Sequence, residues 1–131
     1  MGFIPESHLD LVKDETKAIA LLATLMKDGS PQLTPVWFNM DGEYILINSA
    51  QGRVKDRNMR REPRVAITIL DPADYYRYIQ IRGRVIEMTT EGAREHINKL
   101  SKKYTGRDKF TPGSEEEIRV TYKILPEFIS V

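Results

Sequence analysis

A chain of 131 residues, 40% hydrophobic and 30% charged, has the size and composition of one domain (residues 1–131) around one hydrophobic core. Its 20 basic and 19 acidic residues nearly cancel, which argues against a general nucleic-acid binder, and zero cysteines exclude disulfides, thiolate metal sites and cysteine nucleophiles. The longest apolar run, 18–26, is too short to span a bilayer, and residues 1–6 do not read as a secretory leader, so we expect a cytoplasmic protein without membrane contact.

The first half of the chain carries two hairpin signals. The apolar run 18–26 and the β-forming run 32–40 are each followed by an Asp-Gly pair, at 28–29 and 41–42. Asp-Gly between apolar runs is a strong signal for the turn of an antiparallel β-hairpin. Residues 44–49 then read as a third strand, so the pattern predicts a meander. Before it, Ser7 is expected to cap a short helix.

The middle of the chain changes period. Residues 51–61 lose the alternation of a strand and predict a short helix that Pro63 ends. Residues 64–70 return to a strand pattern, a turn follows, and 75–88 reads as a long strand.

The last third holds the longest predicted helix, 90–104, with Thr90 as its expected cap. Two strand-like pieces follow, 118–125 and 127–131, separated by Pro126. This element order predicts a mainly β fold, a β-barrel with a few helices, and not an alternating α/β sheet.

The long strand 75–88 has two unlike faces. One face is aliphatic and predicts a core contact: Ile79, Ile81 and Val85. The other face carries aromatic, amide and cationic side chains: Tyr78, Gln80, Arg82 and Arg84. Because arginines do not belong in a dry core, we expect this second face to meet solvent, a ligand or another subunit.

Hydrolytic and zinc chemistry have little support in the sequence. The two histidines, His8 and His96, have no serine, aspartate or second ligand at motif spacing, and both are expected to be solvated surface residues. No metal site is predicted.

An anion site is one interpretation of residues 48–58. There a strand ends in short polar residues, Gly52 allows a turn, and Arg53 and Lys55 open the predicted helix. Free N–H groups at a helix start, together with cationic side chains and the hydroxyl of Ser49, suit a phosphate dianion. A solvated basic helix is the alternative, and the residues alone leave both interpretations open.

Pro35 lies inside a predicted strand, where it cannot donate a ladder hydrogen bond. An edge position explains it. A functional interpretation is that the backbone near Thr34, Pro35 and Val36 is left open for the edge of a flat ring. Trp37 and Phe38 are expected in the core or at a dimer interface.

Three ordered blocks carry a family resemblance. The first is 29–38, the second is 52–66, which begins Gly-Arg-Val-Lys-Asp-Arg-Asn, and the third joins Leu-Asp-Pro at 70–72 to 76–83. In these blocks the chain resembles the flavin- and deazaflavin-dependent oxidoreductases of the pyridoxamine 5'-phosphate oxidase-like superfamily, and most closely their branch that uses coenzyme F420.

The resemblance implies an FMN-binding split barrel that forms a homodimer, with the cofactor at the subunit interface. It places Arg53 and Lys55 on the phosphate, with Ser49 and Asn58 as nearby donors. The other implied cofactor-site residues border the ring, line the adjoining strand or lie at the dimer interface: Gln32, Thr34, Pro35, Val36 and Trp37; Ile47 and Asn48; Tyr78 and Arg82. No residue stands out as the catalytic proton donor.

The activity implied is hydride transfer from reduced coenzyme F420 to an unsaturated or quinonoid small molecule. One alternative is an FMN-binding oxidase or flavin reductase of the same fold, and another is a non-enzymatic carrier of flavin or F420. Pyridoxamine-phosphate oxidase activity itself is not expected, because the tail after Arg107 offers no counterpart of the substrate-phosphate residues. A nucleic-acid-binding barrel is the most distant alternative.

Overall fold

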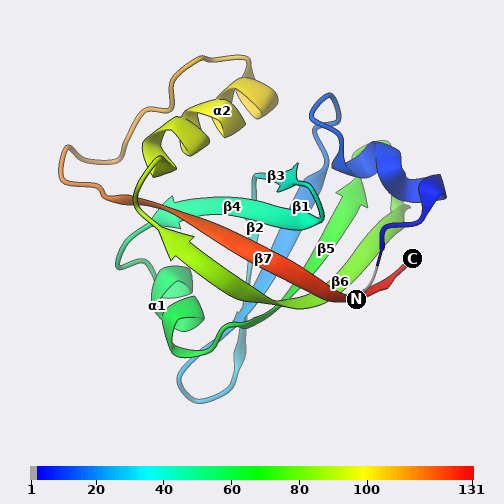
Figure 1. The fold of residues 1–131 in the computed structure, drawn as a ribbon, viewed down its shortest axis with the longest axis horizontal. Helices are drawn as coiled ribbons and strands as arrows, with labels where there is room; N and C mark the ends of the chain where they lie inside the picture. The colour runs from blue at the N-terminus through cyan, green and yellow to red at the C-terminus, as the bar shows by residue number, and fades with distance from the viewer. Residues whose placement is uncertain (1–2) are drawn as a thin grey trace.

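One strongly curved antiparallel sheet dominates the computed structural model, which describes residues 3–131 (Figure 1). Residues 1 and 2 of the N-terminal segment 1–6 lie outside the described part. The strands are β1 (Ile19–Leu25), β2 (Pro31–Val36), β3 (Phe38–Asp41), β4 (Tyr44–Ala50), β5 (Arg64–Asp71), β6 (Asp74–Thr89) and β7 (Arg119–Ser130). The helices are the 3-10 helix η1 (Glu6–Val12), α1 (Val54–Arg61) and α2 (Ala93–Thr105). The predicted mainly β barrel with a few helices is confirmed.

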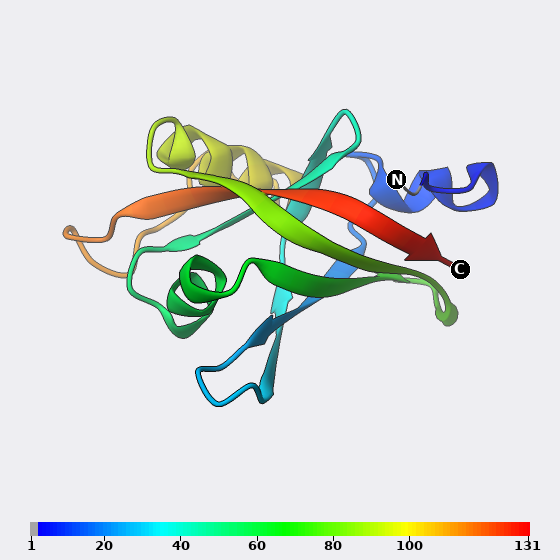
Figure 2. The ribbon, with the colours of Figure 1, turned by 60° about the horizontal axis from the view of Figure 1, so that its bottom comes forward.

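The strand order shows how the sheet closes. It runs β2-β1-β5-β6-β7-β4-β3, so β2 and β3 lie at opposite ends of the order. Trp37 alone joins them in the chain, which brings the two ends together and curls the sheet into a barrel (Figure 2). The predicted meander is therefore wrong: the run 32–40 is two strands, of which β2 pairs with β1 and β3 pairs with β4. Alternation of side chains does not reveal a change of partner within such a run.

Pro35 lies in β2, which has only β1 as a neighbour, so the edge position predicted from its missing N–H is confirmed.

The two α-helices cover different parts of the sheet. α2 packs on β4 and β7, and α1 packs on β1 and β4. Within residues 3–131 no helix is both long and apolar enough to cross a membrane.

The core fills the inside of the curved sheet. The predicted core face of β6 is confirmed, because Ile79, Ile81 and Val85 are all buried. The largest side chains beside them are Phe38 and Tyr122, both fully buried. Each fully buried aliphatic or phenylalanine side chain contributes about 1.5–3 kcal/mol relative to exposure, so this face supplies much of the stabilisation.

Three local predictions differ from the structure. Ser7 caps no helix, since its hydroxyl lies 2.8 Å from Nδ1 of His8. α2 begins after Gly92, whose φ of 74° suits glycine, and Thr90 provides no side-chain cap. The tail is one strand, β7, and not two: Pro126 sits opposite Gly83 where the register shifts, so its missing N–H falls at an irregularity of the ladder.

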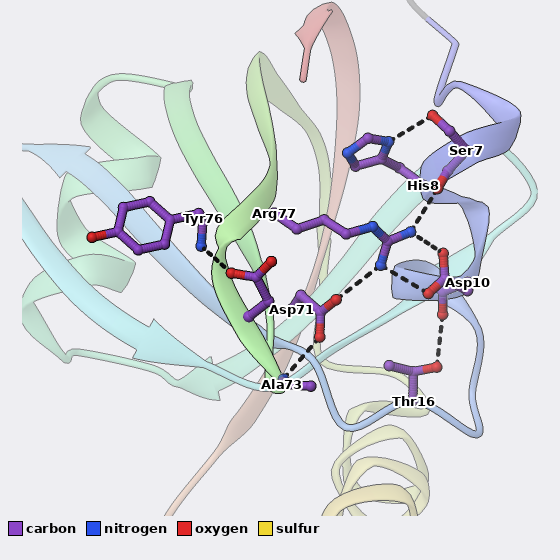
Figure 3. Close-up of polar contacts among 9 residues, drawn as sticks. Ser7, His8, Asp10, Thr16, Asp71, Ala73, Tyr76 and Arg77 are labelled. Atoms are coloured by element: carbon purple, nitrogen blue, oxygen red, sulfur yellow. Dashed lines mark hydrogen bonds and ion pairs between the residues drawn. The ribbon is translucent and has the colours of Figure 1, made fainter.

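Arg77 fastens the N-terminal helix η1 to the β5–β6 hairpin. Its guanidinium donates to the carboxylates of Asp10 and Asp71 and to the carbonyl of Ser7, with Nη1–Oδ2 distances of 3.0 Å to Asp10 and 2.9 Å to Asp71 (Figure 3). The hydrogen bonds from Arg77 lower the pKa of the Asp10 carboxyl. Arg77 thus links η1 to the β5–β6 hairpin, while Leu11 of η1 is buried in the core.

We expect Arg77→Ala to lower the free energy of unfolding only slightly, by about 0–1 kcal/mol, because these ion pairs are only partly buried and solvent screens them. Hydrogen exchange should nevertheless accelerate in η1, since its hydrogen bonds to Arg77 are gone. Lys102→Ala, which removes the exposed Lys102–Asp108 pair at 3.2 Å, is the matched control and should leave exchange in η1 unchanged. Unchanged exchange in Arg77→Ala would show that packing alone holds the helix.

Candidate functional site

A cleft of about 410 Å³ opens where α2 and the loop after it face the β2–β3 junction. It draws residues from both halves of the chain. Its lining is Ile19, Pro35, Val36, Trp37, Asn48, Arg53, Lys55, Ile97, Leu100, Tyr104, Phe110 and Arg119. Among these lining residues there is no carboxylate and no histidine. The cleft therefore suits binding of an anionic, flat molecule better than proton transfer by a side chain.

The apolar side of the cleft is aromatic. The rings of Trp37 and Tyr104 stack in parallel, with centroids 5.5 Å apart and planes 5° apart. Phe110 meets Trp37 edge-on, with centroids 6.1 Å apart. The hydroxyl of Tyr104 donates to the carbonyl of Ala18 at 2.8 Å, and burial raises the pKa of Tyr104 to about 12, so it remains a donor. The rings are thus fixed before any ligand arrives.

The polar end of the cleft is cationic. Arg53 is the N-cap residue of α1, Lys55 lies in its first turn, and Arg119 opens β7. Burial, and then the charges of Arg53 and Arg119, lower the pKa of Lys55. The carboxylate of Glu117 accepts from Nη1 of Arg119 at 2.7 Å and lies 3.6 Å from Nη2 of Arg53. Three cations therefore face one carboxylate, and the surplus of positive charge fits a bound dianion.

Almost all of the Arg119 side chain is buried, and several partners hold it in place. Its Nε donates to Oδ1 of Asn48 at 2.8 Å, and its guanidinium lies 5.0 Å from the centre of the Phe110 ring. A buried guanidinium is stable only when it is paired and hydrogen-bonded. Asn48, Glu117 and Phe110 meet that need and hold Arg119 in the lining of the cleft.

The prediction that His96 is a solvated surface residue is wrong. Its ring is mostly buried between α2 and the sheet, where Nε2 lies 2.7 Å from Oδ1 of Asn39 and Nδ1 lies 3.1 Å from Nδ2 of Asn48. Burial, and then the charges of Lys99 and Arg119, lower its pKa to about 4. The polar side of α2 was assigned to solvent, but part of it rests on amide side chains of β3 and β4.

Of the cofactor-site residues expected from the sequence, six line the cleft: Pro35, Val36, Trp37, Asn48, Arg53 and Lys55. The other seven do not: Gln32, Thr34, Ile47, Ser49, Asn58, Tyr78 and Arg82. Phe38 is buried in the core as expected, whereas its neighbour Trp37 is half-buried in the cleft wall.

Ser49 and Ile47 share the face of β4 that points into the core, opposite Asn48. The hydroxyl of Ser49 is buried and has no hydrogen-bond partner among residues 3–131. Gln32 and Asn58 meet elsewhere, since both hydrogen-bond to the hydroxyl of Thr24, at 3.2 and 3.1 Å. These polar groups are brought together, but outside the cleft.

Tyr78 and Arg82 lie on the outer face of β6. Arg82 borders a separate groove of about 720 Å³ along β5, β6 and β7, and its guanidinium lies 4.6 Å from the centre of the Phe128 ring. Phe128 is 60% exposed, so a large apolar ring lies at the surface beside the Arg82 guanidinium. This groove has no second cation beside Arg82 in its lining, so we take the cleft and not the groove as the candidate cofactor site.

Six lining residues of the cleft were missed: Ile19, Ile97, Leu100, Tyr104, Phe110 and Arg119. The sequence gave one indication of Arg119, which is a charged residue at the start of a strand with Glu117 two positions before it. Tyr104 gave none, because its spacing on α2 matches an ordinary core contact. Within residues 3–131 no group of three or more histidine, aspartate or glutamate side chains is placed to hold a metal ion.

Comparison with known proteins agrees with this architecture. A structure solved as an F420 reductase is 31% identical, superposes with a TM-score of 0.85, and the match covers 97% of this chain and 98% of that one. A candidate pyridoxamine 5'-phosphate oxidase from Listeria innocua is 22% identical over 95% of this chain and 94% of its own, with a TM-score of 0.71. The conserved protein Rv2991 from Mycobacterium tuberculosis is also 22% identical, over 97% and 83%, with a TM-score of 0.72.

The two chains at 22% identity show the shared fold alone. The family model described as pyridoxamine 5'-phosphate oxidase matches residues 5–125, which is nearly the whole chain and includes every lining residue of the cleft. The chain therefore belongs to the pyridoxamine 5'-phosphate oxidase family, in the split-barrel fold.

Proposed function

We propose that the protein is an oxidoreductase that binds coenzyme F420 in this cleft and transfers a hydride from the reduced deazaflavin to an unsaturated or quinonoid small molecule. The observation that carries the proposal is the pairing of a stacked aromatic wall with a surplus of positive charge in one cleft. The similarity to an F420 reductase at 31% identity supports the choice of cofactor.

The residues fit a phosphate-bearing flavin or deazaflavin. Arg53 and Lys55 would hold the phosphate at the start of α1, where the first turn has no side-chain cap and its N–H groups are free to donate. Pro35 and Val36, on an edge strand, would border the ring, and Trp37 would support it. The core-facing Ser49 and the internally bonded Asn58 have no part in this arrangement.

When bound, the cofactor supplies the hydride chemistry. The protein's contribution is orientation and electrostatics: the cations fix the anionic end, and the aromatic wall limits how the ring can lie. Ile97 and Leu100 of α2 exclude water from one side of the cleft. Tyr104 is committed to the carbonyl of Ala18, so its hydroxyl serves to position the wall.

We also propose a homodimer in the cytoplasm, with the outer face of β6 around Tyr78 and Arg82 against the second subunit. The exposed Phe128 beside Arg82 supports this assignment, because an isolated subunit would leave a large apolar ring in water.

Two alternatives share the same cleft. An FMN-binding oxidase or flavin reductase would use the same phosphate contacts, and a non-enzymatic carrier would bind the cofactor without turnover. Sustained turnover with an electron donor separates the carrier from both enzymes.

We expect Lys55→Ala to weaken cofactor binding by about 10- to 100-fold, the effect of losing one charge-assisted hydrogen bond to phosphate. The measurement is a titration with coenzyme F420 and with FMN, followed by ring fluorescence. Arg57→Ala, which removes an exposed charge from the same helix outside the cleft, is the control and should bind normally.

Tighter binding of F420 than of FMN, lost in Lys55→Ala alone, supports the proposal. Tighter binding of FMN than of F420 would instead assign the protein as a flavin enzyme. If neither cofactor binds the unmodified protein, the proposal is wrong.

A further inference from the structure

A chain of polar side chains runs from the sheet edge at β3 through α2 to the cleft. It links Asn39, His96, Asn48 and Arg119 by contacts of 2.7, 3.1 and 2.8 Å. Three of these four residues are buried and His96 is mostly so, although only Asn48 and Arg119 line the cleft. Buried polar groups of this kind need a complete set of partners, so each orientation constrains the next.

The amide of Asn48 can lie in only one orientation. Its Oδ1 faces Nε of Arg119, which can only donate, and its Nδ2 lies 2.9 Å from the carbonyl of Ala93, which can only accept. The group turned toward the imidazole is therefore the N–H of Nδ2.

This fixes the chemical state of His96. Because Nδ2 of Asn48 donates at 3.1 Å, Nδ1 of His96 is the unprotonated acceptor. Nε2 carries the proton and donates to Oδ1 of Asn39 at 2.7 Å. The hydroxyl of Thr121, 3.2 Å from Nδ1, can adapt as a second donor.

We propose that His96 is a positioning residue for the cleft: its neutral ring, accepting at Nδ1 and donating at Nε2, fixes the amide of Asn48 and through it the guanidinium of Arg119. A donor in place of Nδ1 would oppose the N–H of Asn48. Relief would require the amide to flip, which breaks its bonds to both Arg119 and Ala93.

The surrounding charges favour the neutral ring. Lys99 on α2 and Arg119 on β7 both lower the pKa of His96, after burial, to about 4. β3 and β4 contribute only uncharged amides, and the charged groups around the Asn39 end are Asp14, Lys99, Lys102 and Lys103. The ring therefore stays neutral over the ordinary pH range, and so does the orientation of Asn48.

This inference rests on the proposed function only in that the cleft binds an anion, so its test uses a probe other than the cofactor. Sulfate keeps its charge above about pH 3. Sulfate, F420 and FMN are each titrated into the protein, and binding is followed by the NMR resonance of the Arg119 Nε–H. We expect His96→Leu to weaken binding of sulfate and cofactor about tenfold, while His96→Asn, which keeps an acceptor near the place of Nδ1, stays within about threefold.

Three readouts separate positioning from a merely structural role. In the unmodified protein, imidazole nitrogen shifts should show the Nε2–H tautomer from pH 8 down to about pH 5. In an Arg119→Ala background, His96→Leu should cause no further loss of affinity, because its effect passes through Arg119. His8→Leu, which changes the other histidine, should leave binding unchanged.

The pH dependence of the free energy of unfolding provides a further test. His96 takes up a proton near pH 6.5 when unfolded but only near pH 4 when folded, so its contribution to stability falls as the pH falls between these values. We expect this slope to be weaker in His96→Asn.

Additive losses in the double variant, an Nδ1–H tautomer, or equal losses in His96→Leu and His96→Asn would each overturn the inference. Failure of F420 and FMN to bind while sulfate behaves as expected would overturn only the proposed cofactor.

Discussion

We expect Asp56→Ala to lower the free energy of unfolding by about 3–5 kcal/mol, because it removes a buried carboxylate whose hydrogen-bond donors then lack an acceptor. Asp56 is 1% exposed and accepts hydrogen bonds from the hydroxyl of Tyr122 at 2.5 Å, Nε of Arg60 at 3.1 Å and the N–H of Gly52 at 2.9 Å. Tyr122 is fully buried, so its hydroxyl would be left without a partner in the core.

Burial alone would raise the pKa of Asp56, but hydrogen bonds from Arg60, Tyr122 and Gly52 hold it below its ordinary value. The carboxylate therefore stabilises the fold above about pH 4, and this contribution is lost as the pH falls further. Urea unfolding at pH 7 measures the main effect. Arg57→Ala is the control, because it removes an exposed charge from the same helix and should cost less than about 1 kcal/mol. A loss below 1 kcal/mol in Asp56→Ala would contradict the assigned role.

Asp56 also ties the fold to the site. It lies between Lys55 and Arg57 on α1 and accepts a hydrogen bond from the buried Tyr122 of β7. Cofactor affinity in Asp56→Ala should therefore fall together with stability, whereas Lys55→Ala should reduce affinity alone.

Gly83→Ala is expected to lower the free energy of unfolding by about 3–5 kcal/mol or to prevent folding, because a side chain at this position meets backbone. A Cβ on Gly83 would overlap the carbonyl oxygen of Leu125 and lie 3.2 Å from Cα of Pro126. Neither atom can move without separating β6 from β7, which are paired along most of their length.

Thermal and urea unfolding, or the yield of folded protein, measure the effect of Gly83→Ala. Arg84→Ala, one residue away on the exposed face of β6, is the matched control and should change stability by less than about 1 kcal/mol. Normal stability in Gly83→Ala would mean that the bulge at Pro126 is able to shift.

The fold was largely predictable because alternation and turn residues act locally. The two Asp-Gly turns, the end of α1 before Pro63 and the apolar face of β6 all follow from short-range rules. The run 32–40 was not resolved, since the change of partner at Trp37 comes from the curvature of the whole sheet.

The candidate site was predictable in part, for a related reason. Arg53 and Lys55 lie in the segment for which an anion site was one of two interpretations, and the cleft includes them. Ser49 was grouped with them by adjacency, yet adjacent residues of a strand point to opposite faces, and Ser49 points into the core. Tyr104 and Arg119 reach the cleft only because α2 and β7 return to it from far along the chain, which local patterns do not encode.

The connection from β2 to β3 is too short to absorb a change in length. A single residue, Trp37, carries the chain from one end of the strand order to the other and also forms the aromatic wall of the cleft. An added residue at this point would open the seam of the barrel and displace the wall in one step. By contrast, residues 106–118 join α2 to β7 without carrying a strand, so that segment can change in length while the seam stays closed. Because this segment carries Phe110 of the cleft lining, a change in its length would alter the shape of the cleft and leave the seam intact.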